Sequence, residues 1–150
     1  MKKNPTGVFC IDKKFIVDEN EKKVTCVFNY SLLGNKNNPL LIFDKNTLMK
    51  MCPILFKKYP QFPNFTAVAV SKMSNEDKNN YEFDIDFGKK LALTKAQAKA
   101  YDMANYVFWN IADEINTYMD KLDDFMHGTA NSYDIECRHE DDLINKKYSN

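Results

Sequence analysis

The chain has 150 residues, of which 44% are hydrophobic and 28% charged, and its formal net charge is zero. This composition is typical of a folded domain and argues against a disordered chain, and the length fits one domain. No run of 18 apolar residues occurs, so no membrane-spanning helix is expected. The basic start of the chain lacks the apolar core of a secretory signal, which favours a cytoplasmic protein.

In chain order, the first predicted elements form an antiparallel hairpin. Residues 8–17 read as one strand, "DENEKK" as a polar turn, and "VTCVFNY" as a second strand with apolar residues at every second position. "LLGNKNNP" is a loop, and "LLIF" is predicted to be a short strand. Asp44 or Asn46 is expected to cap a short helix through "TLMKMC", and Pro53 to interrupt or restart it.

A further strand is predicted at "FTAVAVSKM", where Ala67 and Ala69 would let a helix approach closely. "SNEDKNN" reads as a turn or loop. "YEFDIDF" alternates apolar and acidic residues, which fits either a fourth strand or an extended segment leading into the next helix.

The longest predicted element is a helix over about residues 88–126, with Asp84 or Asp86 as its N-cap and Gly128 as its stop. Its apolar residues are three and four apart, which is a heptad seam. They are Tyr101, Ala104, Phe108, Ile111, Ile115, Tyr118, Leu122 and Phe125. Either the helix lies across the sheet as an ordinary amphipathic element, or Phe108, Ile111, Ile115, Tyr118 and Leu122 form a seam for homodimerisation. Trp109 is expected in the core or an interface.

These elements predict an α+β fold: a small antiparallel sheet of three to five strands packed on one long C-terminal helix, with a short helix in the middle. Residues 1–127 would form one domain, and 128–150 a polar C-terminal tail.

The zero net charge conceals an asymmetry. Residues 1–101 carry seventeen lysines and ten acidic residues, whereas residues 102–150 carry four basic and eleven acidic residues. Such a division can orient partners, or the two halves can neutralise each other within one fold. The acidic candidates for partner contact are Asp113, Glu114, Asp120, Asp123 and Asp124; the basic candidates for phosphate contact are Lys89, Lys90, Lys95 and Lys99.

Little in the sequence points to catalysis. The two histidines, His127 and His139, lie in the polar C-terminal region, and no phosphate-binding glycine loop is present. The four cysteines form no CxxC pair and are expected to be small buried side chains; they are Cys10, Cys26, Cys52 and Cys137. We therefore predict no catalytic residues, no metal site and no cofactor.

The segment "FTAVAVSKMSNEDKNNYEFDIDFGKKLALTKAQAKAY" resembles a recurrent piece of small phage and prophage proteins from low-GC bacteria. The resemblance covers residues 10–105, and Ser71 stands where the family has cysteine. The matching residues are Ala67, Ala69, Phe83, Asp84, Gly88, Lys89, Lys90, Leu91 and Ala92. It implies a small antiparallel sheet packed on one main helix, in a protein of the bacterial host cell.

Three functions follow as hypotheses. The first is a non-enzymatic phage or mobile-element protein that uses an acidic helical surface to inhibit a host defence component, such as a CRISPR effector, because nucleic-acid grooves are lined with Lys and Arg. The second is a nucleic-acid-binding module that uses the four lysines. The third is a sponge for a signalling nucleotide.

Overall fold

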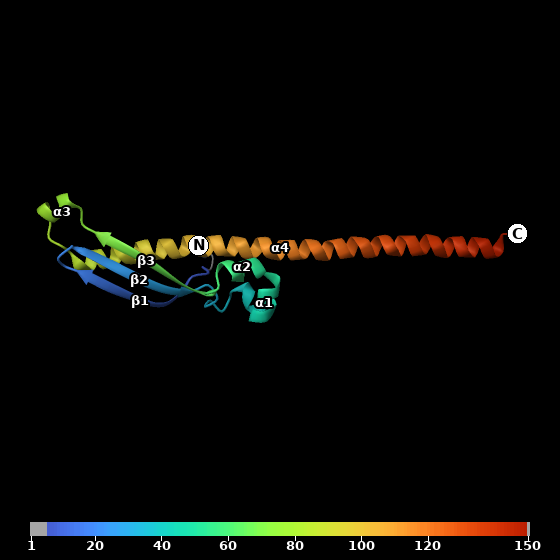
Figure 1. Cartoon of the computed structure of the whole chain (residues 1–150), viewed down its shortest axis with the longest axis horizontal. Coiled ribbons are helices and arrows are strands. Elements are labelled where there is room, and N and C mark those ends of the chain that lie inside the picture. The colour runs from blue at the N-terminus through green and yellow to red at the C-terminus, as the bar shows by residue number, and fades with distance from the viewer. Residues whose placement is uncertain (1–5, 150) are drawn as a thin grey trace. The chain divides into compact units, whose positions relative to one another are not determined.

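The computed structural model describes residues 6–149 (Figure 1). The chain divides after Ile111 into two units. The first unit contains the described strands and short helices together with the start of the last helix. The second unit, from Ala112 onward, is the remainder of that helix. The α+β class predicted from the sequence is confirmed.

The sheet has three antiparallel strands in the order β1 (Phe9–Asp18), β2 (Lys23–Ser31) and β3 (Asn64–Lys72). In the turn between β1 and β2, the Glu21 N–H donates to the Asp18 carboxylate at 2.9 Å, and Lys22 adopts a left-handed backbone with φ 49°. Alternate residues face a buried side because side chains alternate across a strand. Those of β2 are Val24, Cys26, Phe28 and Tyr30, and those of β3 are Phe65, Ala67, Ala69 and Ser71.

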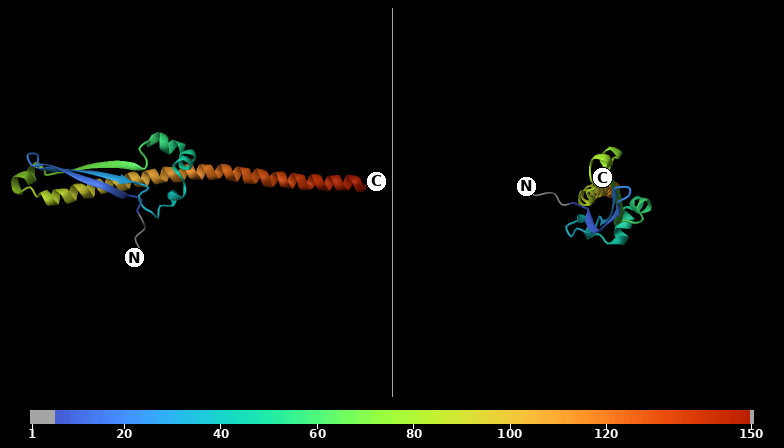
Figure 2. Two further views of the ribbon diagram at one scale, coloured as in Figure 1. Left: turned by 90° about the horizontal axis from the view of Figure 1, so that it is seen from below. Right: turned by 90° about the vertical axis from the view of Figure 1, so that its left-hand side faces the viewer.

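Helix α4 (Ile85–Tyr148) begins at a side-chain cap, and the part of it that belongs to the first unit covers the buried face of the sheet (Figure 2). The Phe87 N–H donates to the Asp84 carboxylate at 3.0 Å, so Asp84 is the cap that the sequence predicted as one of two. The buried residues of α4 are almost all small and recur every three or four positions: Gly88, Ala92, Ala96, Ala100, Ala104, Val107 and Ile111. Small residues bring the helix close to the strands, and Gly88 lies against Val24.

Between β2 and β3 the chain forms three short helices: η1 (Pro39–Ile42), α1 (Lys45–Met51) and α2 (Pro53–Lys58). Asp44 caps α1 by accepting from the Thr47 N–H at 2.7 Å, which lowers the pKa of that carboxyl. Pro53 starts α2, as predicted. Each helix buries one leucine in the core, at Leu40, Leu48 and Leu55 respectively.

Several boundaries differ from the sequence-based expectations. "LLIF" lies in the 3-10 helix η1 rather than in a strand, because the Asn38 side chain accepts from the Leu40 N–H and caps it. "SNEDKNN" contains helix α3 (Asn75–Asn80), capped by Ser74. Residues 81–87 do not form a fourth strand, since α4 already begins at Ile85.

The largest difference concerns the end of α4. The helix runs through Gly128 and continues to Tyr148, so the predicted stop was wrong. The predicted domain boundary near residue 127 stays a prediction, and the two compact units of the structure meet after Ile111. A Cβ atom added at Gly128 would meet nothing within 4 Å, so the glycine serves no close packing there.

Candidate functional site

The second unit, described by itself, is a bare helix with apolar side chains on one side. Ten residues follow the spacing 4-3-4-4-3-4-4-3-4, and nine of them are apolar. We call this set the C-terminal stripe: Ile115, Met119, Leu122, Met126, Ala130, Tyr133, Cys137, Asp141, Ile144 and Tyr148. Because an α-helix has about 3.6 residues per turn, these positions share one side. Most are well exposed; Met126, for example, is 61% accessible.

The stripe has a period of eleven residues, since the triplet 115, 119 and 122 is followed by 126, 130 and 133 and then by 137, 141 and 144. Eleven residues in three turns give 3.67 residues per turn. This value is close to that of a straight α-helix, so the stripe stays on nearly the same side along its length. This is a different pattern from the heptad seam of the sequence analysis, which alternates three and four. Within the second unit the two patterns share Ile115 and Leu122 and differ at Tyr118 and Phe125.

The residues of the predicted heptad seam belong to both units of the structure. Ile111 is buried and Phe108 half-buried within the first unit, where the Phe108 ring covers Gly7. In the second unit Ile115 is half-buried, whereas Tyr118 and Leu122 are exposed. The seam as a self-association surface stays a prediction. Trp109 is 65% exposed, which excludes the core and leaves the interface as the remaining expectation for this residue.

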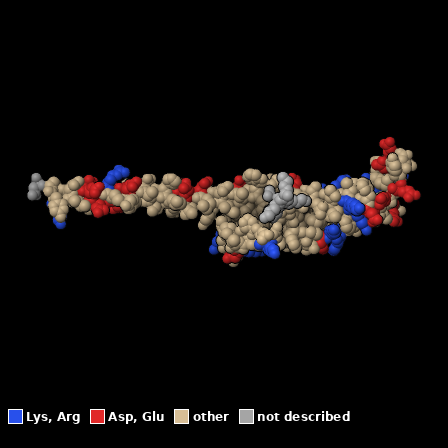
Figure 3. Space-filling view, turned by 180° about the vertical axis from the view of Figure 1, so that it is seen from behind, with Lys and Arg blue, Asp and Glu red and all other residues tan. Residues whose placement is uncertain are grey.

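The predicted acidic contacts lie at the start of the second unit. By the helical period, Asp113, Asp120 and Asp124 are on the side away from the stripe, whereas Glu114 and Asp123 border it. All but the half-buried Glu114 are exposed. The unit as a whole carries ten acidic and four basic residues. Figure 3 shows acidic groups recurring along this helix, while lysines gather over the sheet in the first unit.

The predicted basic contacts lie in the first unit, and two of them support the sheet. Strand β3 is an edge strand, and among residues 6–149 no further strand pairs with its outward carbonyls. The ammonium of Lys99 donates to the Val68 carbonyl at 2.7 Å, and that of Lys95 to the Val70 carbonyl at 3.4 Å. Lys89 lies over the Phe15 ring, 5.8 Å from its centroid, and Lys90 is exposed. The four lysines therefore do not form a single cluster of ammonium groups available for phosphate contact.

An open groove of about 730 Å³ lies between β3 and α4 within the first unit. At its wall the Lys58 ammonium donates to the Tyr106 hydroxyl at 2.8 Å and lies 4.6 Å from the centroid of that ring. This hydrogen bond raises the pKa of Lys58 and lowers the pKa of Tyr106. Lys99 also lines the groove but is engaged by β3.

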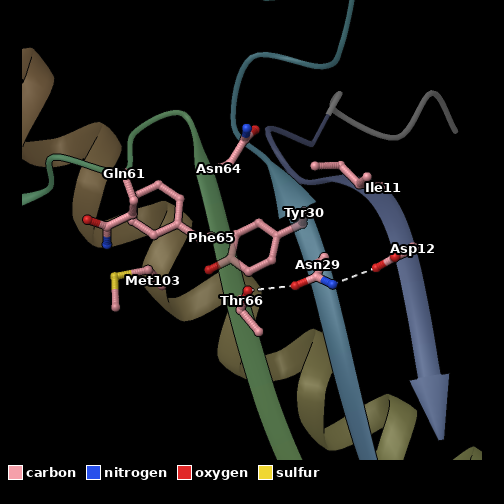
Figure 4. A pocket seen from close by; sticks show the side chains of 9 residues that line it. All are labelled: Ile11, Asp12, Asn29, Tyr30, Gln61, Asn64, Phe65, Thr66 and Met103. Carbon is pink, nitrogen blue, oxygen red and sulfur yellow. Dashed lines mark hydrogen bonds between the residues drawn. The ribbon is translucent and has the colours of Figure 1, made fainter.

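A second hollow, of about 640 Å³, lies near one end of the sheet (Figure 4). Here Asn29 links the three strands: its amide N–H donates to Asp12 and its oxygen accepts from the Thr66 hydroxyl, both at 2.6 Å. These polar atoms hold neighbouring strands together.

The cysteines occupy different environments. Cys26 and Cys52 are buried, as expected, and burial raises the pKa of the Cys26 thiol. Cys10 is exposed and Cys137 partly so, which contradicts the expectation for those two. Within residues 6–149, no three His, Cys, Asp or Glu side chains are placed to hold a metal ion. In the same range, no helix has the length and apolar character that crossing a membrane demands.

Comparison of the chain with protein-family models, curated proteins and solved structures found no match.

Proposed function

We propose that the protein is a non-enzymatic phage or mobile-element protein that binds a host defence component and blocks its nucleic-acid site. The observation that carries the proposal is the exposed acidic side of the second unit. Asp113, Asp120 and Asp124 recur at intervals of seven and four residues, which spaces three carboxylates over about 17 Å of helix. Grooves that hold nucleic acid are lined with cations, and an acidic helix competes for them.

The excess of acidic residues supports the same partner chemistry. Asp120, Asp123 and Asp124 lie within five positions, with Lys121 as the one cation among them. Like charges on neighbouring turns destabilise an isolated helix, and a cationic partner would relieve that repulsion. The partner proposed is therefore a protein with a Lys- and Arg-lined groove, of which a CRISPR effector is the most concrete case.

The test is competition for nucleic acid on a purified CRISPR effector, measured by polarisation of a fluorescent duplex. The unmodified chain should displace the duplex, and the triple variant Asp113→Asn, Asp120→Asn, Asp124→Asn should lose most of that ability. A matched control removes three exposed charges from the first unit through Glu19→Gln, Glu76→Gln and Glu82→Gln. Equal loss in both variants would mean that net charge matters and the acidic side does not; full competition by the triple Asn variant would refute the proposal.

The nucleic-acid-binding alternative is less well supported, because Lys95 and Lys99 are engaged by β3. It requires the chain itself to bind duplex DNA or RNA, with an affinity that falls steeply as salt rises. The same fluorescent duplex, titrated with the chain in the absence of an effector, measures this directly.

A further inference from the structure

The C-terminal stripe leaves a long apolar side of a helix without a cover inside its own unit. Its well-exposed members include Leu122, Tyr133, Ile144 and Tyr148. From Met119 to Tyr148 the stripe extends over about 45 Å of helix. Helices gain most of their stability in water from packing an apolar side, and contiguous apolar surface of this extent marks an interaction site.

We propose that the stripe pairs with the stripe of a second copy of this chain, with the two helices antiparallel. This inference concerns the side of the helix opposite the acidic side and does not depend on the proposed function. An eleven-residue repeat is the pattern by which helices pack along a common seam with little or right-handed supercoiling.

When a second copy of the helix runs in the opposite direction and is aligned at Tyr133, the members of the two stripes lie opposite one another. In that register, Leu122 of one copy meets Ile144 of the other, and the two Tyr133 rings meet at the two-fold axis. The small Ala130 then lies near Cys137 of the second copy, and Met119 near Tyr148. Apart from Asp141, apolar residues thus meet apolar residues at each level of the contact.

The charges favour the antiparallel orientation. Asp141 is the one charged member of the stripe, and a parallel pair would place the two Asp141 carboxylates against each other in the seam. An antiparallel pair puts each of them beside Met126, about 24 Å from the other.

The same charges disfavour a lipid surface as the cover. Helices that lie on anionic membranes carry Lys and Arg on their polar side. Here the polar side is acidic, with ten acidic residues against four basic ones across the unit.

The first test is the mass of the full chain in solution, by sedimentation equilibrium over a range of concentrations. The expected species is a dimer of about 35 kDa, twice the 17.5 kDa of one chain. Because the Leu122–Ile144 contact occurs twice in a two-fold dimer, Ile144→Asp places a carboxylate against an apolar residue at two places and should raise the dissociation constant about thirty-fold or more.

The matched control is Ile135→Asp, the same substitution at an exposed isoleucine on the opposite side of the same helix. It should leave the dimer unchanged. A single-chain mass at high concentration, an assembly larger than a dimer, or equal effects of the two substitutions would overturn the proposal.

The second test determines orientation without introducing a charge. One chain carries Leu122→Cys and the other, lengthened by a tag, carries Ile144→Cys, both with Cys10→Ser and Cys137→Ser. A short bismaleimide should link the tagged to the untagged chain. Linkage of like chains, 122 to 122 or 144 to 144, would show a parallel pair and overturn the antiparallel assignment.

Discussion

Gly88 of α4 lies so close to Val24 of β2 that a Cβ atom at residue 88 would be 2.8 Å from Val24 Cγ2. Both residues are buried, and Val24 is a β-branched side chain with little rotamer freedom. This contact sets how closely the first turns of α4 approach the sheet.

Gly88→Ala should therefore destabilise the first unit. Overpacking costs about 1–3 kcal/mol, whereas replacing a helical glycine by alanine returns at most about 1 kcal/mol. The free energy of unfolding, measured by denaturant titration, should fall. Val24→Ala alone leaves a cavity. The double variant should lose less free energy of unfolding than the sum of the losses in the two single variants. Strict additivity would show that the two residues are not in contact.

Gly128→Ala should act in the opposite direction. Gly128 lies inside α4 with open space around its Cα, so alanine gains up to about 1 kcal/mol of helix propensity without a steric cost. Helix content by circular dichroism and the melting temperature should both rise. Asn131→Ala, at an exposed position one turn further on, is the control, because it shows how much an alanine substitution changes stability where no glycine is replaced. A loss of helix content in Gly128→Ala would mean that the helix ends there, as the sequence had indicated.

Lys99→Met should weaken the edge of the sheet. It removes the ammonium that donates to the Val68 carbonyl at 2.7 Å and leaves the aliphatic part of the side chain. Because the site is exposed, the loss should be about 0.5–1.5 kcal/mol, the range of an ordinary net hydrogen bond. Lys90→Met, an exposed lysine of the same helix, should change stability by less than about 0.5 kcal/mol. Equal effects would argue against the edge-supporting role.

The cap of α1 should make stability depend on pH. The backbone N–H of Thr47 lowers the pKa of Asp44 in the folded chain, so the carboxylate stabilises the fold above the unfolded pKa of about 3.9. That contribution is lost as the pH falls through the lower, folded pKa. Asp44→Ala should reduce the melting temperature at pH 7, and the difference from the unmodified chain should shrink towards pH 2.

Asp44→Ser is the control for this prediction, because a neutral hydroxyl caps a helix at every pH. Its melting temperature relative to Asp44→Ala should stay constant between pH 7 and pH 2. If the difference between the unmodified chain and Asp44→Ala did not change with pH, Asp44 would not be the titrating cap.

The strands could be predicted from the sequence because their apolar residues alternate and one side is buried. The buried side of β2, for example, was evident from Val24, Cys26, Phe28 and Tyr30. The start of α4 at Asp84 and the break at Pro53 follow from local chemistry, since a side-chain cap and a missing N–H act within one turn. Short elements such as η1 and α3 were missed because a few residues carry too weak a periodicity.

The end of α4 was mispredicted for two reasons. Gly128 is a common helix stop, but inside a helix it costs only about 1 kcal/mol, which the surrounding turns can outweigh. A heptad seam has alternating steps of three and four, whereas the apolar residues beyond Leu122 follow 4-4-3 instead. Residues such as Tyr133, Cys137, Ile144 and Tyr148 do not fit a heptad, so the segment resembles a polar tail.

The side of α4 that packs on the sheet was visible in the sequence as a run of small residues four apart, from Gly88 through Ala92, Ala96 and Ala100. The heptad seam predicted from the sequence consists mostly of larger residues such as Tyr101, which is 48% exposed. By contrast, no local pattern could reveal the bonds from Lys95 and Lys99 to β3. They join residues 25 and 31 positions apart, which only the packed fold brings together.

The eleven-residue period divides the second unit into repeats that are each about 17 Å long. Deleting residues 127–137 would shorten the helix by one repeat and leave Tyr148 aligned with Leu122 and Ile115 as before. Deleting five residues instead would turn everything beyond the cut by about 130°, because each residue advances the helix by about 98°. Length changes of eleven residues are therefore the ones that this segment tolerates without losing its alignment.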